Sequence, residues 1–143
     1  MKISTRGRYA LRVMTDLAER SGGEYIPLKD IILRQGISQK YLEGIMTDLS
    51  KAGVVDAKHG KGGGYKLAKS PDSITVGDIL RVTEGELSPV SCLDENARPC
   101  LRAAECRTLP MWTKLYAMIN DFFNGYSLAD LMQNGSATDN YVI

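Results

Sequence analysis

Residues 35–49 read QGISQKYLEGIMTDL and combine a glycine, a serine and a helical repeat of apolar residues. Gly36 suits the end of one helix, because glycine adopts the left-handed backbone that many helix ends need. Ser38 can cap the following helix with its hydroxyl. The spacing of apolar residues in that helix predicts a buried stripe of Leu42, Ile45, Met46 and Leu49. Two short helices joined by so tight a turn form a helix-turn-helix.

Upstream of this motif the sequence predicts an amphipathic helix over residues 8–20, which Ser21 and two glycines end. Its apolar face comprises Ala10, Val13, Met14, Leu17 and Ala18. The next helix is expected to carry Pro27 in its first turn, since proline suits the start of a helix, and to stop at Gly36.

Downstream of the motif the pattern changes from helical to extended. Val54 and Val55 predict a short strand, residues 58–64 (KHGKGGG) a flexible basic turn, and residues 65–67 a returning strand. A hairpin in this position is the wing of a winged helix-turn-helix. Thr75 and Asp78 then resemble a capping box at the start of a short connector helix.

The C-terminal half contains an irregular segment followed by a long helix. Residues 85–109 lack periodicity and contain all three cysteines. Pro110 is expected to begin a helix with an apolar face of Trp112, Leu115, Ile119 and Phe122, flanked by Met111, Met118 and Phe123. This face must be covered, either by the core of the same chain or by the same helix of a second subunit, which we favour. Ser127 and Asp130 predict a cap for a last helix over residues 128–132.

The charge of the chain is unevenly distributed. Residues 1–69 hold thirteen Lys and Arg against seven Asp and Glu, a balance of +6, whereas residues 70–143 have a balance of −5. The N-terminal half therefore suits a polyanion, although scattered surface charge could also divide in this way. The sequence has no apolar run long enough to span a bilayer and no apolar segment typical of a signal peptide, so we expect a cytoplasmic protein.

The second helix of the motif has the residues expected of a DNA-reading helix. Its outer face near the N-terminus comprises Ser38, Gln39, Lys40, Glu43, Gly44 and Thr47. In the major groove Gln can read adenine and Glu can accept from cytosine N4, while Lys40 and Tyr41 suit phosphate contacts. The alternative is an ordinary solvated helix face.

The wing favours the DNA interpretation. Its glycine run is flanked by Lys58, His59, Lys61 and Lys66, which can reach a phosphate or a minor groove. A nucleotide-binding loop would need Gly-Lys-Ser/Thr at the start of a helix, whereas Gly64 precedes a strand. No Cys-x-x-Cys motif, nucleophile and base pair or cofactor fingerprint is present, so an enzyme is not expected.

Four separated runs resemble a known regulator family. They are RGRYALR at residues 6–12, QGIS at 35–38, YLE at 41–43 and GGGY at 62–65, and together they resemble the family that contains IscR, NsrR and CymR. The resemblance extends from residue 1 to about residue 133. It implies a homodimer whose long helices, here residues 110–124, cross at the interface while two heads bind a pseudo-palindromic site. It also implies base reading by Glu43, whereas the wing arginine of IscR is replaced here by His59.

The predicted fold is thus mainly α with a small β-hairpin wing, a winged helix-turn-helix plus a long C-terminal dimerisation helix. We expect a DNA-binding region over residues 1–72 and a polar tail over residues 135–143. Between them, residues 73–134 would hold the connector helix, a cysteine loop (88–109) and the dimerisation helices.

The cysteines are Cys92, Cys100 and Cys106, separated by seven and by five residues. Thiolates are soft ligands that suit iron, and an odd number of cysteines in a cytoplasmic protein disfavours disulfides. The resemblance implies an iron–sulfur cluster, 2Fe-2S or 4Fe-4S, because IscR and NsrR bind theirs in this loop. Unliganded or redox-reactive thiols are the alternative.

The fourth ligand of such a cluster stays open. IscR-like proteins use a histidine where this chain has Leu109, and NsrR-like proteins use an aspartate at the position of Arg8. Asp94, Glu95, Glu105 or an external thiol could serve instead.

The sequence therefore predicts a DNA-binding transcriptional regulator, with a repressor favoured, that senses iron–sulfur status or redox and thiol signals. Residues 88–90 and the C-terminal DNYVI resemble the CymR branch. The first alternative is accordingly a cluster-free, CymR-like regulator of cysteine and sulfur metabolism that acts with a partner enzyme. The second is a winged-helix module that binds protein.

Overall fold

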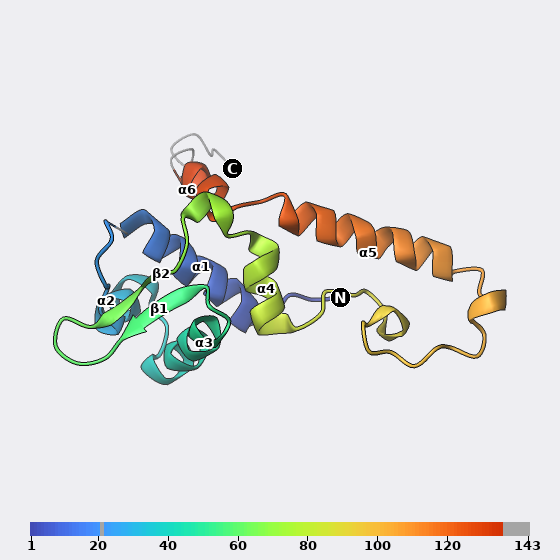
Figure 1. Ribbon diagram of the computed structural model, residues 1–143, viewed down its shortest axis with the longest axis horizontal. Coiled ribbons are helices and arrows are strands. Elements are labelled where there is room, and N and C mark those ends of the chain that lie inside the picture. The colour runs from blue at the N-terminus through green and yellow to red at the C-terminus, as the bar shows by residue number, and fades with distance from the viewer. Residues whose placement is uncertain (21, 136–143) are drawn as a thin grey trace.

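The computed structural model describes residues 1–20 and 22–135 and shows a winged-helix head from which one long helix projects (Figure 1). The helices are α1 (Thr5–Arg20), α2 (Leu28–Gln35), α3 (Gln39–Lys51), α4 (Val76–Glu84), α5 (Leu109–Asn124) and α6 (Leu128–Gly135). The strands are β1 (Val55–Lys58) and β2 (Gly64–Leu67). The predicted mainly helical fold with a small hairpin is confirmed. Most of the predicted polar tail, residues 136–143, lies outside the described residues.

The turn between α2 and α3 has the predicted structure. Gly36 adopts a left-handed backbone, with φ 65° and ψ 30°, and its N–H donates to the Ile32 carbonyl. The Ser38 hydroxyl accepts from the Tyr41 N–H at 3.3 Å and so caps α3. Pro27 differs from the prediction by one position, because it precedes α2 as the N-cap residue in an extended conformation.

The core of the head forms where α1, α2 and α3 meet. All four residues of the predicted stripe on α3 are fully buried, and the apolar residues predicted on α1 are buried as well. Full burial of one Leu, Ile or Met side chain contributes roughly 1.5–3 kcal/mol, so this stripe fixes the orientation of α3 and leaves its opposite face outside. The same core also contains Ile31 of α2, Ile74 before α4, Ile79 of α4 and Leu128 of α6.

The wing is an antiparallel pair in which Val55 faces Leu67 and Lys58 faces Gly64. Its first strand begins one residue later and ends three residues later than predicted. The second strand of the wing is also bonded to the α1–α2 connection, because Ile26 and Tyr65 exchange backbone hydrogen bonds of 2.8 and 2.9 Å. Gly64 is required there, since a Cβ at that position would lie 2.1 Å from the Ile26 carbonyl oxygen.

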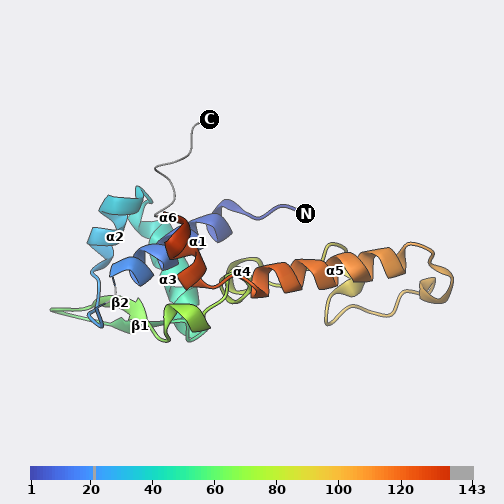
Figure 2. The same cartoon turned by 90° about the horizontal axis from the view of Figure 1, so that it is seen from above.

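The long helix α5 projects from the head and is attached near its C-terminal end (Figures 1 and 2). Ile119 and Phe123 pack against Val76 and Leu80 of α4, and no residue of α5 is buried. The predicted apolar face therefore divides into two. Ile119 contacts the head, whereas an exposed row is formed by Met111, Leu115, Met118 and Phe122.

The chain returns from α5 to the head through α6. Backbone hydrogen bonds from Val76 to Tyr126 (2.8 Å) and from Leu128 to Ile74 (2.9 Å) fix this return. Capping boxes begin both α4, at Thr75, and α6, at Ser127, as predicted, although α6 continues past residue 132 to Gly135. None of the helices within the described residues is long and apolar enough to cross a membrane.

Candidate nucleic-acid interface

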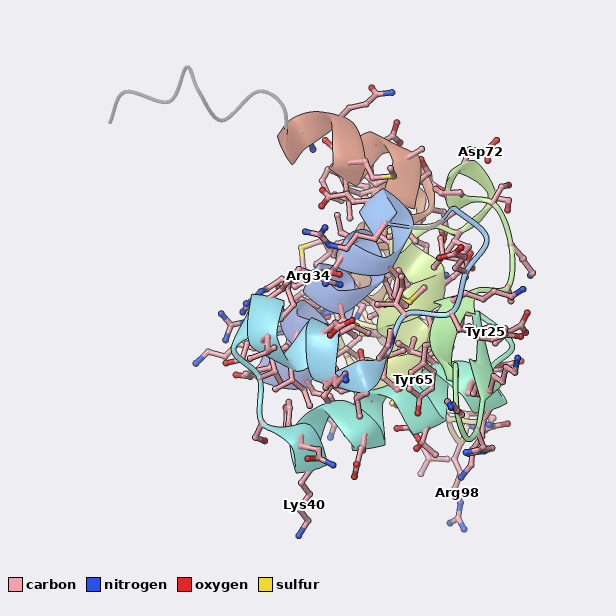
Figure 3. All side chains as sticks on the ribbon, turned by 90° about the vertical axis from the view of Figure 1, so that its left-hand side faces the viewer. Tyr25, Arg34, Lys40, Tyr65, Asp72 and Arg98 are labelled. Carbon is pink, nitrogen blue, oxygen red and sulfur yellow. The ribbon has the colours of Figure 1, made fainter. Side chains whose placement is uncertain are left out.

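The first turns of α3 form an exposed polar surface. Ser38, Gln39, Lys40 and Glu43 are all exposed, and Figure 3 shows Lys40 pointing away from the body of the head. The Gln39 amide donates to the Glu43 carboxylate at 2.9 Å, which holds the two side chains together. Both groups retain acceptor capacity, which suits the amino groups that adenine and cytosine present in the major groove.

Two residues of the predicted surface have a different setting. Tyr41 is half-buried and packs edge-on against Tyr9 of α1, with ring centroids 5.7 Å apart. Gly44 was expected on the outer face, but it lies against α1, where its carbonyl accepts from Arg6 at 3.2 Å. This carbonyl is therefore engaged in holding α3 on α1.

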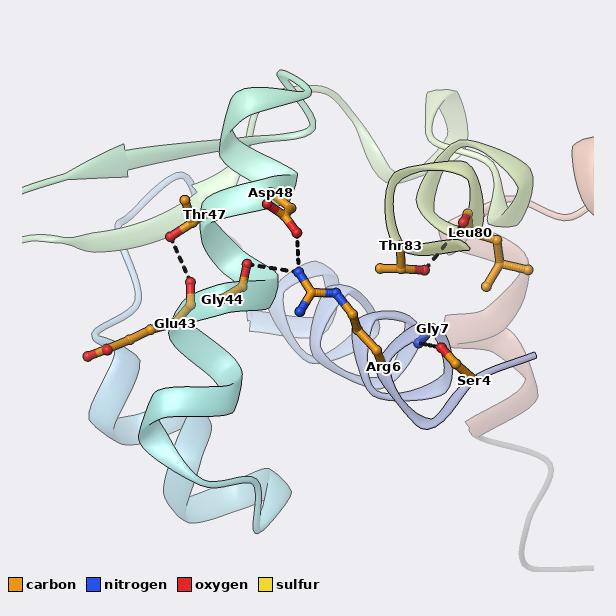
Figure 4. A network of polar contacts seen from close by, with 9 residues as sticks. All are labelled: Ser4, Arg6, Gly7, Glu43, Gly44, Thr47, Asp48, Leu80 and Thr83. Carbon is orange, nitrogen blue, oxygen red and sulfur yellow. Dashed lines mark hydrogen bonds and ion pairs between the residues drawn. The ribbon is translucent and has the colours of Figure 1, made fainter. Parts of the chain in front are cut away.

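Arg6 fixes α3 from the side opposite the wing (Figure 4). Its guanidinium also forms an ion pair with Asp48 of α3. Ser4, two residues before Arg6, fixes the start of α1. Its hydroxyl accepts a hydrogen bond from the Gly7 N–H, and its backbone N–H donates to the Glu84 carboxylate of α4. The sequence does not predict this role of Arg6, because Arg6 and Asp48 are 42 residues apart and no local pattern connects them.

An open groove lies between α3 and the wing. It is lined by Glu43 and Thr47 of α3, by Lys58 and His59 of the wing, and by Lys29 of α2. Lys29 was not predicted as a site residue, although a basic residue in the first turn of the first motif helix was a usable signal. The groove brings polar side chains of α3 together with basic side chains of α2 and the wing.

The wing carries the predicted basic residues in exposed positions. His59 and Lys61 lie in its turn, and Lys58 lies at the end of β1. Lys58 and Lys66 both place their ammonium groups over the ring of Tyr25, 5.7 and 4.6 Å from its centroid. Cation–π contacts of this kind limit the motion of lysine side chains, and Figure 3 shows Tyr25 beside the wing strands.

A buried carboxylate joins α1 to α2. Asp16 is 4% exposed and accepts hydrogen bonds from Arg34 (2.6 Å) and from Gln35 (2.8 Å). Burial alone would raise the pKa of Asp16, but these hydrogen bonds and the positive charges of Arg34 and Arg20 outweigh it, so the pKa is lowered from 3.8. The pair also raises the pKa of Arg34. This contact orients α2, and through the short turn it orients α3.

The cysteine loop lies between α4 and α5, apart from α3 and the wing (Figure 1). Cys92 and Cys100 are exposed and Cys106 is partly buried, and all three are free thiols. The Cys106 thiol lies 3.4 Å from the Thr108 hydroxyl. This hydrogen bond, with backbone hydrogen bonds from Thr108 and Leu109, lowers the pKa of Cys106 from 9.0.

The loop does not hold a preformed metal site. Among the described residues, no three His, Cys, Asp or Glu side chains lie close enough together to bind a metal ion. Of the predicted fourth ligands, Asp94 already accepts a hydrogen bond from Ser88, and the backbone N–H of Glu95 donates to Glu86. The donor chemistry suits iron, whereas binding would require the loop to close.

Sequence comparisons match most of the chain to known regulators. Residues 3–134 match the Rrf2 family, described as iron-dependent transcriptional regulators. Protein rrf2 of Nitratidesulfovibrio vulgaris is 40% identical over 137 residues, which are 95% of this chain and 90% of that protein. The transcriptional regulator IscR of Vibrio parahaemolyticus is 37% identical over 143 residues, which are 100% of this chain and 81% of that protein.

Solved structures give the same relationship. CymR, the global cysteine regulator of B. subtilis, superposes with a TM-score of 0.74 at 36% identity, over 94% of this chain and 98% of that one. IscR of T. potens superposes with a TM-score of 0.73 at 32% identity, over 100% of this chain and 94% of that one. With its helix-turn-helix, wing and projecting helix, the chain belongs to the Rrf2 family of DNA-binding transcriptional regulators, which are not enzymes.

Proposed function

We propose that the protein is a cytoplasmic homodimeric repressor that binds operator DNA with two winged-helix heads and is controlled by its cysteine loop. The observation that carries this proposal is the exposed face of α3 beside a basic wing. In this proposal residues 1–72 read DNA, residues 73–134 connect, sense and pair, and the cysteine loop spans residues 88–109.

The DNA contacts divide into two kinds. Ser38, Gln39 and Glu43 face base edges in the major groove, where each good contact is worth about 1–3 kcal/mol of discrimination. The contacts to phosphates or to the minor groove come from Lys40, Tyr41, Lys58, His59 and Lys61. The groove between α3 and the wing supports this division, because Glu43 lines it from α3 while Lys58 and His59 line it from the wing.

Pairing occurs through α5. The exposed row of Met111, Leu115, Met118 and Phe122 repeats at intervals of four, three and four residues, the spacing of a helix–helix seam. Met118 and Phe122 are 59% and 61% exposed, which is costly for apolar side chains in water. A second copy of α5 offers the same row and would cover this one.

Sensing is assigned to Cys92, Cys100 and Cys106. Three free thiols on one exposed loop are suitable donors for an iron–sulfur cluster, and the family description and the IscR relatives support iron as the ligand. When bound, such a cluster supplies sensitivity to iron supply and to oxidants. The residues of the chain contribute the thiolates and a loop that joins α4 to α5.

A cluster-free regulator of cysteine and sulfur metabolism, acting with a partner enzyme, is the second candidate. It is favoured by the absence of a preformed metal site among the described residues and by the similarity to the cysteine regulator CymR. A winged-helix module that binds only protein fits less well, since the exposed α3 face and the wing combine base-reading and basic groups.

DNA binding is tested by its dependence on salt. Each phosphate contact contributes about 0.9 to the slope of log affinity against log salt concentration. Lys58→Met with Lys61→Met removes two contacts from each head, so it should lower the slope by about 3.6 when both heads of the dimer bind. Gln39→Ala is the matched variant, and it should reduce discrimination between sequences without changing the slope. Duplex binding with no salt dependence would contradict the proposal.

The sensing assignment is tested by purification without oxygen. We expect iron, sulfide and a visible chromophore in the wild-type protein. These should be lost when Cys92, Cys100 and Cys106 are changed to alanine, while circular dichroism stays unchanged. An iron-free wild-type protein that still binds operator DNA would support the cluster-free candidate, and a triple variant that retains the chromophore would exclude these ligands.

A further inference from the structure

Arg81 of α4 is hydrogen-bonded to two amide side chains at the C-terminal end of α5. One guanidinium nitrogen donates to the Asn124 side-chain oxygen at 2.9 Å, and the other donates to the Asn120 side-chain oxygen at 2.7 Å. Asn120 and Asn124 lie one helical turn apart on the same face of α5. The planar fork of one arginine therefore spans a full turn of the projecting helix and fixes its direction as well as its distance.

The space for the hydrogen bond between Arg81 and Asn124 depends on Gly77. A Cβ at position 77 would lie 2.3 Å from the Asn124 side-chain oxygen and 2.7 Å from the Arg81 guanidinium. Beside these hydrogen bonds, Ile119 and Phe123 of α5 pack against α4. The end of α5 is thus held by a polar contact and an apolar contact at once, while the rest of the helix extends away from the head (Figures 1 and 2).

The length of α5 makes this contact important for DNA binding. A helix of 16 residues is about 24 Å long, at about 1.5 Å per residue. A rotation of about 10° at the attached end would move the far end by about 4 Å, close to the rise of about 3.4 Å between base pairs. If the two α5 helices pair antiparallel, the partner's head lies beside this far end, and such a rotation changes the separation of the heads by about one base-pair step.

We propose that Arg81 is a positioning residue, which sets the angle between α5 and the head and thereby the half-site spacing that the dimer prefers. This inference rests on the proposed homodimer. Arg81 acts through α5, since its guanidinium donates to Asn120 and Asn124 instead of facing the groove beside α3.

The test measures affinity for operators whose two half-sites are moved apart in single base-pair steps, starting from a duplex that wild-type protein selects from random sequences. Wild-type protein should prefer its best spacing at least tenfold over spacings one base pair shorter or longer. Arg81→Met should reduce this preference to less than threefold, and Arg81→Lys should retain an intermediate preference. Asn120→Ala with Asn124→Ala should reproduce Arg81→Met, and adding Arg81→Met to that pair should change nothing further.

Lys114→Met is the matched control, because it removes one positive charge from an exposed position of α5 and should keep the wild-type preference. A general loss of structure lowers the affinity equally at every half-site spacing. A change in the ratio of affinities between spacings therefore reports a positioning role. An unchanged ratio in dimeric Arg81→Met protein, or an equal loss at every spacing, would overturn the role of Arg81. Monomeric wild-type protein in sedimentation at binding concentrations would instead overturn the homodimer.

Discussion

Arg6, in the first turn of α1, and Asp48, in the last turn of α3, form an ion pair that fixes α3 to the start of the fold. Arg6→Met removes this pair and the hydrogen bond to the Gly44 carbonyl. We expect the free energy of unfolding to fall by about 1 kcal/mol, because both partners are partly exposed. DNA affinity should also fall, since α3 loses a support. Urea unfolding and fluorescence anisotropy measure the two effects.

Arg8→Met is the control for this variant. Arg8 is exposed and donates to Thr5 within the same helix, so its loss should change stability by less than about 0.5 kcal/mol. Equal destabilisation by the two variants would show that the ion pair with Asp48 contributes nothing particular.

Gly64→Ala should disconnect the wing from the α1–α2 connection. The added Cβ would lie 2.1 Å from the Ile26 carbonyl oxygen, and the φ of 146° at this position disfavours an L side chain. We expect weaker DNA binding and a smaller salt dependence, with helix content retained in circular dichroism. Gly22→Ala is the control, since a Cβ there meets nothing within 4 Å. Wild-type affinity and salt dependence in Gly64→Ala would contradict a role of the anchored wing.

Asp16 should make the stability of the head depend on pH in acid. Its pKa in the folded protein lies below the ordinary value of 3.8, so the carboxylate contributes stability that is fully present above the unfolded pKa. This contribution is lost as the pH falls through the folded pKa. Asp16→Asn should be less stable at pH 7 by about 1–2 kcal/mol and should lose less stability below about pH 4. Urea unfolding across this range measures both; parallel pH profiles for the two proteins would contradict the assignment.

Leu115→Glu should separate the proposed dimer. A charge in the middle of the exposed row on α5 would have to be buried against a second copy, which is costly without a partner charge. We expect a monomer in sedimentation with unchanged circular dichroism. Thr113→Glu, also exposed on α5 but outside the row, should remain dimeric. A dimeric Leu115→Glu protein would place the pairing surface elsewhere.

Cys106 should react as a thiolate at a lower pH than an ordinary cysteine. The hydrogen bonds from Thr108 and Leu109 stabilise the charged form, so the midpoint of alkylation by iodoacetamide should lie below pH 9.0. The measurement uses protein in which Cys92 and Cys100 are serine. Thr108→Val should raise the midpoint by removing the hydroxyl; no change in that variant would exclude Thr108 as the cause.

Local signals explain how much of the fold could be predicted. Gly36, Ser38 and Thr75 act within one turn of their own helices, and the structure places helix ends or caps at each of them. The apolar face of α5 was predicted only in outline. Its residues were assigned to one surface, whereas packing on α4 turns Ile119 and Phe123 toward the head and leaves a second row exposed. The spacing of apolar residues shows that α5 has an apolar side. It does not show which of these residues pack on the head and which stay exposed.

The candidate site shows the same limit. The exposed positions on α3 followed from its buried stripe, so Gln39 and Glu43 could be predicted from the sequence. Arg6 and Arg81 could not, since their partners lie 42 and 39 residues away and the contacts exist only after folding. Lys29 differs from these two, because its place in the first turn of α2 was a local signal, although the groove that it lines forms only after folding.

The absence of buried residues on α5 also bears on how the protein would respond to its own abundance. Since residues of the same chain cover both buried apolar clusters of the head, a newly synthesised chain can fold before it meets a second copy. If pairing follows folding and most chains are monomeric, the concentration of the dimer rises with the square of the concentration of the chain. A modest change in expression would then produce a disproportionate change in promoter occupancy, before any signal reaches the cysteines.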